Sequence, residues 1–281
     1  SNQVLGQQRQ NFVSVKDETS GKVIIGVEDG ANNSYCDLLF YVNASKTIEE
    51  PNDRPVITPD DGNEPEKPDV TETKTGTLAF EDIWPGGGDY DMNDVIVEYN
   101  RAVSFDKKNQ VTKIVDTFTP VHDGAVFANA FAYQVDKGQF GKMTFSATTE
   151  GIHTESATSS IIVCPNVKQA IQKVYTITRE FTGGSFNKKD LKSYNPYIIV
   201  KYAEGQKGRT EVHLPKHEAT SLADLSLAGT QKDAYYIDKE GAYPFAIDIP
   251  ILNFISVTEK KSIDTEYPNF KAWADSKGEK Y

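Results

Sequence analysis

Acidic and amide side chains are concentrated in one short stretch, LAFEDIWPGGGDYDMNDVIVEY, at residues 78–99. Within it, Asp89, Asp91 and Asn93 occupy alternate positions after three glycines, where the backbone can turn without a Cβ clash. Oxygen atoms at the first, third and fifth positions of a tight loop suit Ca²⁺, a hard cation that binds oxygen ligands. We therefore predict a calcium loop to which Asp89, Asp91 and Asn93 contribute oxygen ligands.

The spacing D-x-D-x-N begins an EF-hand loop, but the rest of that motif is missing. Asp94 stands where the motif needs glycine, and Asn100 stands where it needs glutamate. Strand-like apolar runs flank the stretch, so we expect a β-hairpin loop that Glu81 or Asp82 closes from the incoming strand. The alternative is a turn whose Asp and Asn side chains bond their own backbone. Carboxylates so close together would repel one another without a cation or strong donors.

Other sequence patterns give little support for catalysis. The sequence has no G-x-S-x-G elbow, and the three glycines precede acids, which would repel a phosphate. His213 and His217 are separated by Pro215, so they cannot share a helix face as a zinc pair, and we expect His213 to be a structural residue at a strand end. The acids cluster on one loop and do not face each other across a cleft as in a glycosidase. We expect no enzymatic activity, with a hydrolase as the alternative.

Composition narrows the classes of partner. The net charge of −11 over 281 residues argues against nucleic acid and anionic membranes, and it is compatible with cations and glycans. No apolar run is long enough to span a membrane. Two cysteines are too few for a disulfide framework or a zinc site. Because Cys36 and Cys164 each adjoin an apolar run, we expect two separate buried thiols, with one long-range bridge as the alternative.

Many short runs of β-branched and aromatic residues, separated by glycine-rich turns, predict a mainly β protein. We expect a jelly-roll-like β-sandwich with a short C-terminal helical segment. Expected strands are Lys22–Val27, Leu38–Val42, Val95–Asp106, Val111–Thr119, Gly124–Val135, Gln139–Thr149, Ile161–Cys164, Val174–Phe181, Tyr197–Ala203 and Thr210–Leu214.

The C-terminal region has helical patterns at Glu259–Tyr267 and Asn269–Lys277. In the second of these, Phe270, Trp273 and Ala274 share one face. That face is expected to dock on the sandwich, with an aromatic ligand platform as the alternative.

The sequence divides into three parts. Residues 49–76 contain five prolines among acidic and amide residues and are predicted to be an extended linker. Residues 77–281 form the main β-sandwich domain. Residues 1–48 are too short for a stable core of their own, so they either add strands to the main domain or belong to a larger N-terminal domain.

Residues 1–48 also repeat the acidic stretch in a partial form, as an acidic β module. Val27-Glu28-Asp29 matches Phe80-Glu81-Asp82, and Asp37 matches Asp94. Asn32, Ser34 and Cys36 replace the alternating oxygen ligands, so we expect weak metal binding there or none. Whether Glu28, Asp29 and Asp37 hold a metal stays open.

The acidic stretch resembles the signature of the LruC-type domain, found in secreted and outer-membrane-associated bacterial proteins, many from Bacteroidetes. The likeness continues through the motifs at Asn195–Ile198, Glu211–Pro215, Tyr243–Ile247 and Pro268–Ala274. It implies an exported lipoprotein or surface protein at the outer membrane or outside the cell. It also implies calcium binding by the acidic motif, and it assigns no reaction. The ligands that the resemblance implies are Glu81, Asp82, Asp89, Asp91, Asn93 and Asp94.

These observations together predict a non-enzymatic, calcium-binding β-sandwich module of a secreted or surface-anchored bacterial protein. Its role would be adhesion or ligand binding, with a surface protein or a glycan as partner. The alternatives are a glycan-binding or glycan-hydrolysing envelope protein and a structural spacer in a surface assembly.

Overall fold

The structure is a computed structural model of the whole chain. It describes residues 12–16, 23–27, 38–42, 70–181, 186–192, 195–205, 208–226, 236–237 and 243–275. The chain divides into two compact units, Ser1–Pro65 and Glu66–Tyr281.

The first unit contains an antiparallel sheet in the order β1-β2-β3. Its strands are β1 (Phe12–Lys16), β2 (Val23–Val27) and β3 (Leu38–Val42), which confirms the two strands predicted here. The predicted acidic residues of this module, Glu28, Asp29 and Asp37, lie outside the described residues, as does Cys36.

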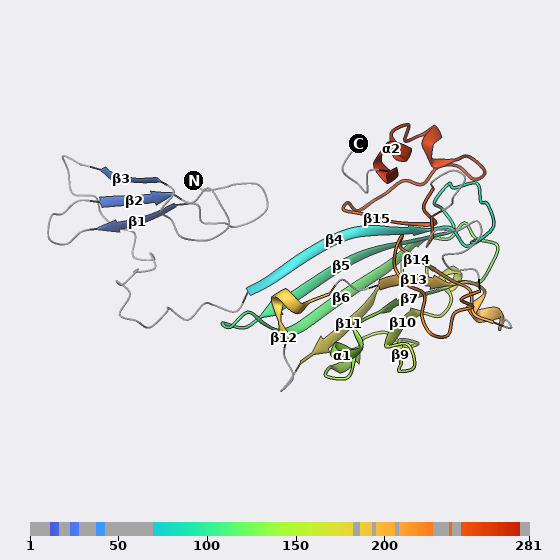
Figure 1. The fold of residues 1–281 in the computed structure, drawn as a ribbon, viewed down its shortest axis with the longest axis horizontal. Coiled ribbons are helices and arrows are strands. Elements are labelled where there is room, and N and C mark those ends of the chain that lie inside the picture. The colour runs from blue at the N-terminus through green and yellow to red at the C-terminus, as the bar shows by residue number, and fades with distance from the viewer. Residues whose placement is uncertain are drawn as a thin grey trace. The chain divides into compact units, whose positions relative to one another are not determined.

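The second unit is built on a seven-stranded antiparallel sheet (Figure 1). Its main path runs β15-β4-β5-β6-β11-β8, and β12 pairs with β6 beside that path. These strands are β4 (Val70–Phe80), β5 (Val95–Phe105), β6 (Gln110–His122), β8 (Thr144–Ala147), β11 (Tyr175–Glu180), β12 (Phe186–Asn187) and β15 (Ala246–Ile249).

A five-stranded antiparallel sheet, in the order β14-β13-β7-β10-β9, packs against the first. Its strands are β7 (Ala130–Gln134), β9 (His153–Glu155), β10 (Ser160–Cys164), β13 (Asn195–Ile199) and β14 (Glu211–His213). Two short α-helices, α1 (Lys137–Phe140) and α2 (Phe270–Asp275), accompany the sheets. Single 3₁₀ turns lie at Val167–Gln169, Lys188–Asp190, Tyr202–Glu204 and Ile263–Thr265.

Aromatic side chains fill the space between the two sheets. Phe118 of β6 lies 5.1 Å from Phe131 and 5.4 Å from Tyr133, both on β7, measured between ring centroids. Phe80, at the end of β4, lies 6.3 Å from the same Phe131 ring. All four side chains are buried. The two facing sheets and the short C-terminal helix confirm the predicted mainly β, sandwich-like fold.

The C-terminal segment covers the other face of the large sheet near its β15 edge. Ala79 of β4 pairs with Ile247 of β15, and both are buried. Ile263 and Phe270 belong to the same apolar cluster as Ile247. The end of β4 is therefore buried from both sides, and Leu78, Ala79 and Phe80 are all inaccessible to solvent. The predicted docking of Phe270 is confirmed, and Trp273 packs partly buried against the same cluster.

Several predicted boundaries were wrong. The predicted strand Gly124–Val135 is shortened to β7, because Gly124 and Ala125 donate backbone hydrogen bonds to Asn93 and Asp94 of the acidic stretch. In the predicted strand Gln139–Thr149, Asp136 caps the helix α1 by accepting from two backbone amides, so the strand begins only at Thr144. The predicted helix Glu259–Tyr267 is reduced to the single turn Ile263–Thr265.

The predicted linker, residues 49–76, overlaps the first strand of the main domain. β4 begins at Val70, because residues 70–76 pair with β5 from Phe105 to Tyr99. These residues are mostly exposed, so they carry no apolar pattern by which a strand could be identified. Residues 49–69 of the predicted linker lie outside the described residues.

A buried ionic network ties the two sheets together around Asp116 of β6. Arg101 Nε of β5 donates to Asp116 Oδ1 at 2.6 Å, and Arg179 Nη2 of β11 donates to Oδ2 at 2.9 Å. Tyr133 of the facing sheet donates its hydroxyl to the same Oδ2 at 3.1 Å. Burial acts to raise the pKa of Asp116, but the two guanidinium groups hold it below its usual range.

We predict that Asp116→Ala destabilises the fold by about 3–5 kcal/mol, because it leaves two guanidinium groups buried without their counter-charge. Urea unfolding measures this loss. The control is Lys74→Ala, which removes an ion pair with Asp248 at 3.0 Å whose lysine is largely exposed. That change is expected to cost less than about 1 kcal/mol. Equal losses in the two variants would contradict the prediction.

Candidate metal centre

All six predicted ligands lie on the loop that joins β4 to β5. The two strands pair in antiparallel register from Val70 opposite Phe105 to Phe80 opposite Val95, so residues 81–94 close the hairpin. The predicted arrangement of strand, acidic loop and strand is therefore confirmed. Because the end of β4 is covered on both faces, the first residue of this loop starts inside the protein.

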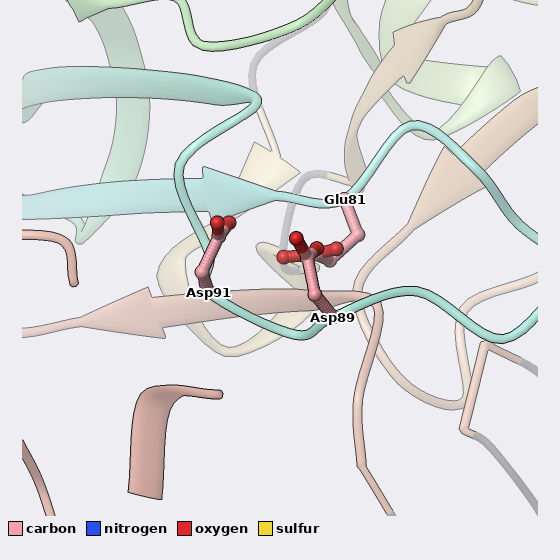
Figure 2. Close-up of side chains that lie close together, drawn as sticks. All are labelled: Glu81, Asp89 and Asp91. Carbon is pink, nitrogen blue, oxygen red and sulfur yellow. The ribbon is translucent and has the colours of Figure 1, made fainter. Parts of the chain in front are cut away.

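Three of the five carboxylates among these ligands lie close together. Glu81, Asp89 and Asp91 each place an oxygen so that all three lie within 4.8 Å of one another. Figure 2 shows Glu81 reaching from the strand end toward the two aspartates on the returning side of the loop. Glu81 and Asp91 are buried, whereas Asp89 is exposed, so the cluster is open to solvent on the Asp89 side. Within the described residues, this is the one group of three or more His, Cys, Asp or Glu side chains spaced to hold a metal ion.

The residues between the oxygen ligands anchor the loop. Tyr90 and Met92 are buried in the core, and both adopt left-handed backbone conformations, with φ of 55° and 56°. Such a conformation is unfavourable for residues other than glycine, so packing must hold it. In the motif D-Y-D-M-N, residues that offer oxygen ligands thus alternate with Tyr90 and Met92, whose side chains are buried.

Backbone amides hold the carboxylates in place. Met92 donates its amide to Glu81 Oε1 at 2.6 Å, and Asn93 donates its amide to Asp91 Oδ1 at 3.3 Å. Lys260, from the C-terminal segment, donates its amide to Asp91 Oδ2 at 3.1 Å. Glu81 also requires Gly88, because a Cβ there would lie 2.9 Å from Glu81 Oε2.

The carboxylates of this cluster are poorly compensated. Burial, reinforced by the charges of Asp94, Asp91 and Asp89, raises the pKa of Glu81 to about 9. Burial and the charge of Asp89 raise the pKa of Asp91 to about 6. The charged neighbours that shift the pKa of Glu81 are thus all carboxylates.

Two other buried carboxylates, Asp116 and Glu211, have cationic partners. Asp116 has two arginines, and Glu211 has His213 together with Arg209, whose Nε lies 2.6 Å from Glu211 Oε1. Although burial acts to raise the pKa of Glu211, these partners hold it below its usual range. Glu81 is buried to the same degree, but it faces like charges instead of a cation.

Asp82 and Asp94 take part in a second set of contacts. Asp82 donates its amide to Asp94 Oδ2 at 2.8 Å, and Asn129 Nδ2 donates to Asp82 Oδ2 at 2.6 Å. Burial and then the charge of Asp82 raise the pKa of Asp94 to about 7. Burial also raises the pKa of Asp82, and the hydrogen bond from Asn129 and the charge of Lys168 oppose that shift. This pair closes the base of the loop.

Asn93 points toward the C-terminal segment. Its Nδ2 donates to Glu259 Oε2 at 3.4 Å. The structure thus brings Glu81, Asp89 and Asp91 together and gives the other three predicted ligands different contacts. Lys260 and Asn129 were not predicted, because both are remote in sequence from the loop and carry no local motif. The glycine run did point to Gly88.

The other predicted residues have ordinary structural surroundings. His213 ends β14 as predicted and is buried, with its ring nitrogens 2.9 Å from Glu211 Oε2 and 2.8 Å from Asn195 Oδ1. Cys164 is a buried free thiol, as predicted for this residue, and it accepts a hydrogen bond from the Tyr175 hydroxyl at 3.5 Å. Within the described residues, no helix combines the length and apolar character needed to cross a membrane.

Comparisons with known proteins place the fold but not the site. A family model described as "Domain of unknown function (DUF4842)" matches residues 109–281 and so begins after the acidic loop. A solved structure with a similar fold is that of a candidate lipoprotein from Bacteroides ovatus. The match has 14% sequence identity and a TM-score of 0.55, and it covers 95% of this chain and 89% of the other. No curated protein sequence matches the chain.

We predict that the cation-free protein loses stability as the pH rises. Folded Glu81 keeps its proton up to about pH 9, whereas the unfolded side chain loses it near 4.5. Between these values unfolding releases a proton, so the free energy of unfolding falls as the pH increases. Urea unfolding in EDTA at pH 7 and pH 9 measures the slope. Glu81→Gln, which cannot ionise, is expected to reduce the dependence of the free energy of unfolding on pH. An unchanged dependence in that variant would show that Glu81 is not its cause.

Proposed function

Since the chain belongs to the DUF4842 family, whose description assigns no activity, we propose its function from the acidic loop itself. Glu81, Asp89 and Asp91 bind a divalent cation, Ca²⁺, which fixes the loop between β4 and β5. The observation that carries this proposal is the buried Glu81 carboxylate, which lies beside other carboxylates and has no cationic neighbour among the groups that shift its pKa. A bound cation supplies the missing charge.

The chemistry of the ligands favours calcium. The three side chains offer only carboxylate oxygens, which suit hard cations and not the softer metals that prefer His and Cys. Ca²⁺ tolerates irregular geometry and both monodentate and bidentate carboxylates, whereas Mg²⁺ demands a near-ideal octahedron. Exposed Asp89 offers a route from solvent, and water completes the coordination.

The role of the cation is structural, and the protein is a binding module of the cell envelope. The three carboxylates lie on one loop within 4.8 Å, which leaves no room for the sugar that a glycosidase holds between its two acids. The LruC-type resemblance and the fold shared with the candidate lipoprotein support an exported location. There the module acts in adhesion or ligand binding, with a surface protein or glycan as partner.

The first test is calcium-dependent stability. At about 100 times the Kd, Ca²⁺ is expected to stabilise the fold by about 2.7 kcal/mol over the EDTA form, and Mg²⁺ by less. Asp89→Asn and Asp91→Asn should each reduce this gain, whereas Glu150→Gln, an exposed residue away from the loop, should retain it. Thermal unfolding and calorimetric titration measure both effects. If Ca²⁺ changes neither the melting temperature nor the heat, the acidic loop is a hydrogen-bonded turn and the proposal is wrong.

A second test uses two adjacent glycines as a matched pair. A Cβ at Gly88 would lie 2.9 Å from Glu81 Oε2, whereas a Cβ at Gly87 meets nothing within 4 Å. Gly88→Ala is therefore expected to displace the Glu81 carboxylate and weaken Ca²⁺ binding about tenfold, an estimate based on lost ligand orientation. Gly87→Ala should bind as the unaltered protein does. Equal affinities in the two variants would show that Glu81 does not contribute to the site.

A further inference from the structure

Residues of β15 and of the C-terminal segment that carries α2 line an apolar groove. Figure 1 shows these two elements near one edge of the large sheet. Its volume is about 550 Å³. Buried Ile247, Ile263 and Phe270 line its inner part, and exposed Ile251, Ile255 and Tyr267 line its outer part. Ile255 is 77% exposed and Ile251 is 56% exposed. Exposed apolar side chains that are gathered in one patch, here beside a concave surface, often mark a binding site.

The volume of the groove fits a small ligand. Pockets for small molecules and cofactors typically measure about 300–1,000 Å³ and are lined mainly by apolar and aromatic side chains. A stable protein interface buries roughly 800 Å² on each partner. The aromatic rings of Phe254 and Tyr267 stack at 5.8 Å along one side and give the groove a defined wall.

The polar side chains of the groove are few, and this restricts the ligand class. Asn253, Glu266 and Asn269 are its three polar lining residues, and all three are exposed. A sugar would lose the hydration of its hydroxyl groups here without gaining enough hydrogen bonds in return. A hydrocarbon chain has no such requirement, and its burial gains about 0.8 kcal/mol for each methylene group.

Charge complementarity restricts the head group. Glu266 is the charged side chain among the residues that line the groove. A carboxylate or phosphate head at the opening would be repelled. We propose that this groove binds the hydrocarbon chain of an amphiphile whose head group is cationic. The proposal does not rest on the cation site of the acidic loop.

Two soluble probes of equal chain length test the head group. Decyltrimethylammonium, titrated below its micelle concentration into the full chain, is expected to saturate a single site in calorimetry. Decanoate is expected to bind at least tenfold more weakly. Glu266→Gln should narrow the difference between the two probes. Equal affinity of the unaltered protein for both probes, or no binding of decyltrimethylammonium, would overturn the proposal.

A matched pair of double variants tests the location. Ile251→Asn with Ile255→Asn changes two exposed residues of the groove, and Val126→Asn with Val174→Asn changes two residues of similar exposure outside it. The first pair is expected to weaken decyltrimethylammonium binding at least tenfold and the second to leave it unchanged. Equal weakening would indicate nonspecific adsorption and overturn the proposal. A self-association that the first pair abolishes, without probe binding, would identify the groove as an interface between copies and also overturn it.

Discussion

Burial of the Glu81 carboxylate is the constraint on which the acidic loop depends. The register of β4 against β5 places Glu81 directly after Phe80, where one face of the sheet meets the second sheet and the other meets the C-terminal segment. The side chain therefore cannot reach bulk water, and its hydrogen bond from Met92 offsets only part of the lost hydration. A proton or a cation has to supply the remaining compensation, and these two compete for the same oxygens.

The same loop organises a distant part of the chain. Tyr90 accepts a backbone hydrogen bond from Ile263 at 2.8 Å, and its ring stacks on Tyr243 at 4.9 Å. Tyr243 in turn stacks on Phe270 of α2 at 6.3 Å. Together with the amide of Lys260 on Asp91, these contacts attach the C-terminal segment to the hairpin loop. The helix α2 is too short to be stable alone, so its position depends on this attachment.

The sequence was informative wherever a pattern is local. β-Branched runs located most strands, and the acidic stretch was correctly placed on a hairpin loop. The sequence did not predict that only three of the six ligands lie together. Adjacent residues in an extended chain point to opposite sides, and this separates Glu81 from Asp82. The contacts of Asn129 and Lys260 could not be foreseen, because they arise from packing between elements far apart in sequence. The start of β4 was missed because exposed strand residues carry no apolar signal.

The proposed cation site and the apolar groove lie in different places, but one residue, Ile263, connects them. Ile263 donates its amide to Tyr90 of the acidic loop, and its side chain lines the groove. Fixing the loop therefore also fixes one wall of the groove, and a ligand in the groove holds the segment that supports Asp91. By thermodynamic linkage, any effect of one ligand on the affinity of the other must be reciprocal. If the cation favours the arrangement of the C-terminal segment that holds the amphiphile, each ligand raises the affinity for the other by the same factor, with no change of fold.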